Sequence, residues 1–103
     1  NDGIIVGAKV GEEVVSPANG RVVNIEDTDR YGKVVTILLG NYYKAYCGQL
    51  DNVDYEIGDD IQEGDVLGTV AEPTKSFVLE GPNIFFKMTY KDKTVNPVKY
   101  LRV

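Results

Sequence analysis

The acidic residues between positions 51 and 65 form the densest group of side chains with chemical potential. They are Asp51, Asp54, Glu56, Asp59, Asp60, Glu63 and Asp65. Closely spaced carboxylates can bind calcium, and a pair of them can cleave a glycosidic bond. The spacing matches no EF-hand loop, and most of these residues fall in predicted turns. We therefore expect a solvated acidic face.

Histidine is absent from the chain, and Cys47 is the only cysteine. The sequence thus lacks the commonest general base and the commonest metal ligand. Cys47 would need a base to act as a nucleophile, so we expect an inert cysteine within a strand. A single cysteine also excludes an internal disulfide and leaves the redox compartment open.

The chain contains seven tyrosines in 103 residues. Tyrosines in a groove can stack on sugars or grip a peptide, but strands also favour them for cross-strand packing. Packing is the favoured interpretation for each tyrosine alone. Tyr42 and Tyr43 are adjacent in a predicted strand and face opposite sides, so we expect one to be exposed. The loop 72–82 carries Phe77, Val78 and Leu79. These either fold back on the core or form a groove wall.

Short apolar runs with a period of two, separated by Gly, Pro, Asn and Asp, predict an all-β protein. Strands are expected at 13–17, 20–26, 33–39, 42–48, 65–71, 84–90 and 93–95. The run 36–39 predicts a central strand covered on both faces, and Gly40 with Asn41 predicts a tight hairpin turn. One short helical turn is expected at 96–101. The fold class is an antiparallel β-sandwich or open barrel, with one domain over residues 1–103.

The net charge is −5 and the pI is about 4.6. This acidity argues against non-specific binding to nucleic acid or to an anionic membrane surface. The sequence has no apolar run of transmembrane length and no signal peptide. Because the initiator Met is missing, we expect a processed or truncated piece of a longer protein.

Glycine and proline motifs follow one another in a fixed order along nearly the whole chain. They lie in NDGIIVGAKVGEEVVSPANGRV (1–22), YGKVVTILLG (31–40), YCGQLDNVDYEIGDDIQEGDVLGTV (46–70), GPNIFFKM (81–88) and VNPVKYL (95–101). This ordered set resembles the LytM or lysostaphin-type zinc metallopeptidases of the bacterial cell wall. The resemblance implies their all-β fold, of the duplicated-hybrid-motif type.

The sequence departs from the resembled family where that family does its chemistry. There, two His and one Asp hold zinc, and a water takes the open fourth position. The matching positions hold Asn1 and Ile5 in the first motif, Leu39 in the second, Gln49 in the third, and Asn83 and Phe85 in the fourth. The resemblance therefore implies no catalytic residue, no metal and no cofactor, and a former site lined by neutral amides and apolar groups.

Family members that lack the zinc ligands serve as envelope scaffolds, activate cell-wall amidases or join sporulation complexes. The resemblance thus implies an inactive binding module outside the cytoplasm, beneath a membrane anchor upstream of this chain. The expected partner is an envelope protein or a peptidoglycan stem peptide. The candidate groove-binding residues are Tyr42, Tyr43, Gln49, Asn83 and Phe85.

Two other classes of function stay open. One is an active peptidoglycan metalloendopeptidase, as the family at large would suggest, although water activation by zinc needs ligands that this sequence lacks. The other is a carrier module, because residues 57–70 also resemble biotinyl and lipoyl domains. Such a carrier needs a modified lysine at a hairpin tip, and Lys75 lacks the expected flanking residues.

Overall fold

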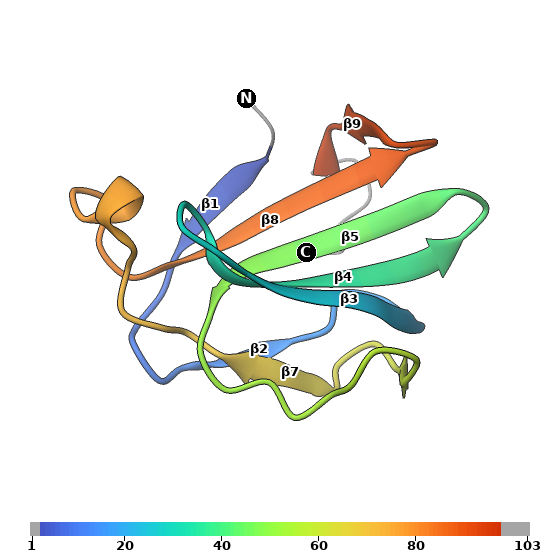
Figure 1. Cartoon of the computed structure of the whole chain (residues 1–103), viewed down its shortest axis with the longest axis horizontal. Coiled ribbons are helices and arrows are strands. Elements are labelled where there is room, and N and C mark those ends of the chain that lie inside the picture. Colours follow the sequence, from blue (N-terminus) through green and yellow to red (C-terminus); the bar gives the residue numbers. More distant parts are fainter. Residues whose placement is uncertain (1–2, 98–103) are drawn as a thin grey trace.

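The computed structural model describes residues 3–97 and consists almost entirely of antiparallel strands (Figure 1). The main sheet has seven strands in the order β1-β8-β5-β4-β3-β6, and β9 also pairs with β8. These strands are β1 (Ile4–Gly7), β3 (Gly20–Thr28), β4 (Gly32–Gly40), β5 (Tyr43–Leu50), β6 (Asp60–Ile61), β8 (Asn83–Tyr90) and β9 (Lys93–Val95). A two-stranded ribbon pairs β2 (Glu13–Val15) with β7 (Val66–Thr69). The expected all-β antiparallel class is confirmed.

All seven strands expected from the period of two are present, but β1 and β6 were missed. β6 has only two residues and β1 has four, so neither offers enough alternation to detect. The loop 72–82 contains a 3₁₀ turn, η1 (Lys75–Phe77), that we also did not predict. The helical turn expected at 96–101 lies largely outside the described residues.

The core lies between one face of the main sheet and the ribbon β2–β7. Val22, Ile37 and Ala45 from the sheet are fully buried, as are Leu67 and Val70 from the other layer. β4 lies between β3 and β5 and is central, as expected. Coverage on both faces fails at Leu38, which is 37% exposed. The reason is that the ribbon covers only one face, and Leu38 lies near the end of its strand on the other.

Two hairpin turns with positive φ close the main sheet at one end (Figure 1). β4 and β5 are joined by Asn41 (φ 52°) and Tyr42 (φ 70°), and β8 and β9 by Lys91 (φ 51°) and Asp92 (φ 65°). Positive φ at both central residues defines the type I′ turn, whose twist matches that of the strands. The turn predicted at Gly40 and Asn41 is thus confirmed, and it extends to Tyr42. The opposite end of the sheet carries the β3–β4 turn and η1.

Candidate functional site

Phe85 lies at the centre of an aromatic cluster near the β3–β4 turn. Its ring is stacked on Tyr31 with 4.0 Å between ring centroids, and Tyr31 contacts Phe77 of η1 at 5.7 Å. Phe85 is only 5% exposed. Two glycines make room for the ring, because a Cβ at Gly48 would lie 3.2 Å from Phe85 Cδ2 and a Cβ at Gly3 would lie 2.9 Å from its Cε1. The sequence thus fills this position with packed rings.

The residues that the resemblance assigns to the zinc-ligand positions do not fit a zinc ion. Ile5 is the register partner of Phe85 across β1 and β8, so the two positions are neighbours. Neither side chain has an atom that can bind a cation, and zinc sites in proteins use nitrogen, sulfur or oxygen ligands. Among residues 3–97, no group of three or more His, Cys, Asp or Glu side chains could hold a metal ion. Asn1, the third position, lies outside the described residues.

Gln49 joins two loops beside this cluster. Its backbone N–H donates to Tyr31 O at 2.6 Å, and its side chain accepts from the Thr74 N–H at 3.4 Å. Its Nε2 donates to Thr74 Oγ1 at 3.4 Å and to Arg30 O at 3.5 Å, while Thr74 Oγ1 donates to Arg30 O at 2.6 Å. Gln49 is fully buried with φ 63°, a strained conformation for this residue type. Hydrogen bonds on several sides hold it there.

Asn83 is 1% exposed and lies on the same face of β8 as Phe85. Its Nδ2 donates to Gly81 O at 2.7 Å. Its Oδ1 is buried and has no hydrogen-bond partner within the described part of the chain. An unsatisfied buried acceptor costs about 1–3 kcal/mol. The amide therefore fixes the turn before β8 at some cost in stability.

A groove opens beside the aromatic cluster, on the sheet face away from the ribbon. Its volume is about 190 Å³, and it is lined by Asn24, Glu26, Thr28, Tyr31, Val34, Thr36, Tyr46, Phe85 and Lys87. The Lys87 ammonium lies 4.5 Å from the centroid of the Tyr46 ring. Sequence reasoning missed Tyr31, Tyr46 and Lys87 as groove residues. The period of two in β5 and β8 offered a signal for Tyr46 and Lys87, since it places them on the face of Phe85.

The candidate groove residues do not all come together. Gln49, Asn83 and Phe85 are buried at one end of the sheet, whereas Tyr42 and Tyr43 lie at the opposite end of β5. One of the two tyrosines is exposed, as expected, but the predicted strand placement of Tyr42 is wrong, because Tyr42 lies in the hairpin turn before β5. Tyr42 is 69% exposed, and half-buried Tyr43 packs against the core. Leu39, expected to line the former site, also packs against the core, near the far end of β4.

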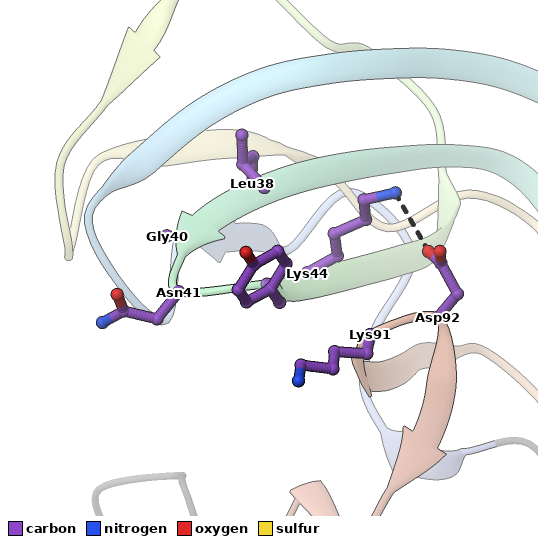
Figure 2. Close-up of a pocket in the computed structure, with 7 residues that line it drawn as sticks. Leu38, Gly40, Asn41, Lys44, Lys91 and Asp92 are labelled. Carbon is purple, nitrogen blue, oxygen red and sulfur yellow. Dashed lines mark hydrogen bonds and ion pairs between the residues drawn. The ribbon is translucent and has the colours of Figure 1, made fainter.

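A second hollow, which we call the hairpin platform, lies between the two type I′ turns (Figure 2). Its volume is about 510 Å³, and it is lined by Leu38, Gly40, Asn41, Tyr42, Lys44, Lys91 and Asp92. Figure 2 shows the ion pair between Lys44 and Asp92, with 3.3 Å between Nζ and Oδ1. The hairpin platform is thus at the opposite end of the sheet from Phe85.

Cys47 and the acidic residues between positions 51 and 65 lie in surroundings that give them no catalytic role. Burial raises the pKa of the Cys47 thiol to about 12, so the thiol stays protonated at neutral pH and is a poor nucleophile. The carboxylates of the acidic run are exposed. Asp59 and Asp65 accept backbone N–H bonds within their own turns at 2.8 and 3.0 Å. The pKa of the Tyr55 hydroxyl is raised, first by burial and then by the nearby charges of Asp65 and Asp59.

One part of the loop 72–82 folds back on the protein, and another part stays exposed. Phe77 folds back on Tyr31, whereas Val78 and Leu79 are 62% and 100% exposed. Lys75 opens the 3₁₀ turn η1 and does not lie at a hairpin tip. The carrier interpretation needed a hairpin tip at Lys75, so its geometric requirement is not met. No helix within residues 3–97 has the length and apolar character needed to span a membrane.

The sheet and its covering ribbon define a lysostaphin-type β-fold. The catalytic domain of lysostaphin from Staphylococcus simulans aligns with a TM-score of 0.85 over 100% of this chain and 80% of its own, at 15% identity, which supports the fold alone. A putative peptidase M23 from Pseudomonas aeruginosa aligns with a TM-score of 0.83 over 93% of this chain and 41% of its own, at 26% identity. The chain belongs to peptidase family M23, whose sequence profile matches residues 1–97.

Curated relatives carry names of regulators of cell-wall hydrolysis. Murein hydrolase activator NlpD of Salmonella typhimurium is 28% identical over 98% of this chain and 26% of its own length. Murein hydrolase activator EnvC of Escherichia coli is 26% identical over 96% of this chain and 23% of its own length. The chain thus spans about a quarter of these relatives. A protein named lipoprotein NlpD from Yersinia enterocolitica is 28% identical over 88% of this chain and 91% of its own length.

Proposed function

We propose that this chain is a non-catalytic M23 domain that works by binding in the bacterial cell envelope, as a regulator of a cell-wall hydrolase. The observation that carries the proposal is the buried ring of Phe85, at a position that the resemblance assigns to a zinc ligand. In a zinc peptidase this position needs a nitrogen, sulfur or oxygen donor and an open path for water. Here it holds a buried ring stacked on Tyr31.

The proton-transfer positions support the same proposal. A general base or acid must reach the reacting group and exchange a proton near the working pH. The two positions in question hold the amides Gln49 and Asn83, which do not titrate. Both are buried, and both direct their side-chain N–H groups at backbone carbonyl oxygens of neighbouring loops. Their chemistry suits holding the loops in place.

The relatives give the kind of process. NlpD and EnvC are named murein hydrolase activators, and each matches nearly the whole of this chain. Other proteins of the same fold carry peptidase names, so the fold itself leaves the activity open. The absence of histidine from the chain favours the activator class. The proposal includes an extracytoplasmic location and a membrane anchor upstream, and a place in a sporulation complex is the alternative to hydrolase regulation.

The groove beside Phe85 is the proposed contact surface for the hydrolase. It offers the half-buried ammonium of Lys87, the Tyr46 ring beneath it and the polar side chains of β3. A cation over an aromatic ring, flanked by hydrogen-bonding groups, suits a peptide segment better than an apolar ligand. A peptidoglycan stem peptide is the second candidate, favoured by the carboxylates that such peptides present to Lys87.

The test combines the chain with labelled peptidoglycan sacculi and with a cell-wall amidase of the same organism. The chain alone, with added zinc, should release no muropeptides and should contain no stoichiometric zinc. The amidase should release more label when the chain is present. Lys87→Glu should reduce this gain, whereas Lys9→Glu, the same charge change on an exposed loop, should leave it intact.

Each outcome decides between the candidates. Release of cross-link fragments by the chain alone, or one zinc per chain, would overturn the proposal in favour of the peptidase. Co-sedimentation with sacculi that Lys87→Glu abolishes, without any gain in amidase activity, would favour the stem-peptide candidate. Equal activation by Lys87→Glu and the unaltered chain would show that the groove is not the contact surface.

A further inference from the structure

The geometry points to a second binding surface: the hairpin platform is a docking site for an acidic segment of a partner protein. It is separate from the groove beside Phe85, and it does not rest on the function proposed for that groove. Four observations carry the inference: the rigidity of the platform, its exposed strained residues, its mixed lining and its charge.

The two hairpin turns are fastened into one unit. The Lys91 N–H donates to Tyr42 O at 2.9 Å, a backbone hydrogen bond from one turn to the other. The Lys44–Asp92 ion pair bridges the same two hairpins, and the rings of Tyr43 and Tyr90 lie 4.7 Å apart beside them. A surface held in one shape loses little conformational entropy when a partner binds.

Tyr42 and Lys91 occupy backbone conformations that their residue types disfavour. Type I′ turns favour Asn, Asp and Gly, because φ is positive at both central positions. A left-handed conformation costs other residues roughly 1–2 kcal/mol. Tyr42 is 69% exposed, so burial of its ring offsets little of this cost. The chain therefore gives up stability to present a tyrosine ring and an ammonium group to solvent, as residues at binding sites often do.

The lining of the hairpin platform combines apolar, aromatic and cationic groups. Leu38 is 37% exposed on the sheet face that the ribbon leaves open. The Lys91 ammonium lies 5.3 Å from the Tyr42 ring centroid and 5.4 Å from that of Tyr90. A carboxylate next to Lys91 would gain an ion pair, and an apolar side chain would cover Leu38. Aromatic side chains such as Tyr42 are enriched at protein interfaces relative to the rest of the surface.

The distribution of charge selects an acidic partner. At the platform end of the two hairpins, residues 38–44 and 90–93 contain three basic residues and one acidic one. Residues 51–65 contain seven acidic residues and no basic one. The hairpins are therefore a cationic region of a chain with net charge −5. Asp60 of this acidic run lies two strands from Leu38, across β3, and its charge is paired with Arg21 at 3.0 Å between Oδ1 and Nε.

The probe is a short fluorescein-labelled peptide in which glutamates flank one Leu-Tyr pair, compared with a peptide that has lysines in place of the glutamates. Binding to the full chain is followed by fluorescence anisotropy and by amide chemical shifts. Tyr42→Asn and Lys91→Asn each introduce asparagine, which favours the type I′ turn, so both variants should fold. Lys9→Asn makes the same charge change on an exposed loop away from the hairpins.

We expect saturable binding of the acidic peptide, with shifts at residues 38–44 and 90–93. Tyr42→Asn and Lys91→Asn should each weaken it at least fivefold, and Lys9→Asn less than twofold. Absence of binding at millimolar peptide, equal affinity for the lysine peptide, or shifts confined to residues around Phe85 would each overturn the proposal. Loss of binding in Lys91→Asn with full binding in Tyr42→Asn and in Leu38→Ala would indicate a simple anion site and would also overturn it.

Discussion

The two ends of the main sheet both contain residues with positive φ, but the strained residue is buried at one end and exposed at the other. At the Phe85 end, Gln49 has φ 63°, is fully buried, and is held by hydrogen bonds to Tyr31, Arg30 and Thr74. At the hairpin platform, Tyr42 has φ 70° and is 69% exposed. Strain surrounded by packing is explained by the fold itself. Strain that burial does not offset needs another explanation, and binding is the one we propose.

Phe85 should carry the largest stability effect of the comparison. Phe85→Ala removes a buried ring from contact with Tyr31, Gly3 and Gly48, and such truncations cost about 3–5 kcal/mol. Tyr42→Ala, the matched truncation at the exposed end, should change stability by less than about 1 kcal/mol. Denaturant unfolding of both variants measures the difference. Similar losses in the two variants would contradict the division into a packed end and an exposed end.

Alkaline pH should loosen both ends together. Cys47 lies in the part of β5 that connects them, and its pKa is raised to about 12 by burial. The folded state therefore keeps the proton above the pH at which the unfolded thiol loses it. The contribution of Cys47 to stability is constant below about pH 9. It falls as pH rises toward 12, by up to about 4 kcal/mol, since a tenfold change in an equilibrium constant is worth about 1.4 kcal/mol.

The measurement is the free energy of unfolding against pH, with signals from Tyr31 and Tyr42 followed separately. Cys47→Ala removes the thiol, so its curve should be flatter between pH 9 and pH 12. All other side chains remain in this control. A curve for Cys47→Ala that is as steep as that of the unaltered chain would contradict the assignment to the thiol.

Gln49 should show an intermediate effect. Gln49→Ala keeps the strained backbone but removes the side-chain bonds to Arg30 and Thr74, leaving the Thr74 N–H without its acceptor. The loss should be about 1–3 kcal/mol. Hydrogen exchange should speed up in residues 71–77 before it does so at the hairpin turns. Uniform acceleration across the sheet would mean that Gln49 supports the whole fold and not only the two loops.

The contrast between the ends also marks how far the sequence predicts the structure. Period-two patterns predicted β4, β5 and β8, which reach both ends, and the resemblance implied that Ile5 and Phe85 line one site; they are register partners across β1 and β8. The stacking of Tyr31 on Phe85 was not predictable, because a turn brings Tyr31 across β5 and no local pattern records that contact. Leu39 was assigned to the former site by its motif, yet it lies near the far end of β4.

Tyr42 should give the smallest effect, and the only one of opposite sign. Tyr42→Gly creates an Asn-Gly turn, the preferred sequence for the type I′ conformation. It removes the strain at φ 70° and loses only a largely exposed ring, so the chain should become more stable by about 0.5–1 kcal/mol. Thermal unfolding measures the gain, and Gly40→Ala, at φ 96°, is the matched control expected to lose stability. If Tyr42→Gly is more stable and still binds the acidic peptide in full, the backbone strain at Tyr42 does not serve binding. The proposed difference between the strain at Gln49 and the strain at Tyr42 would then be wrong.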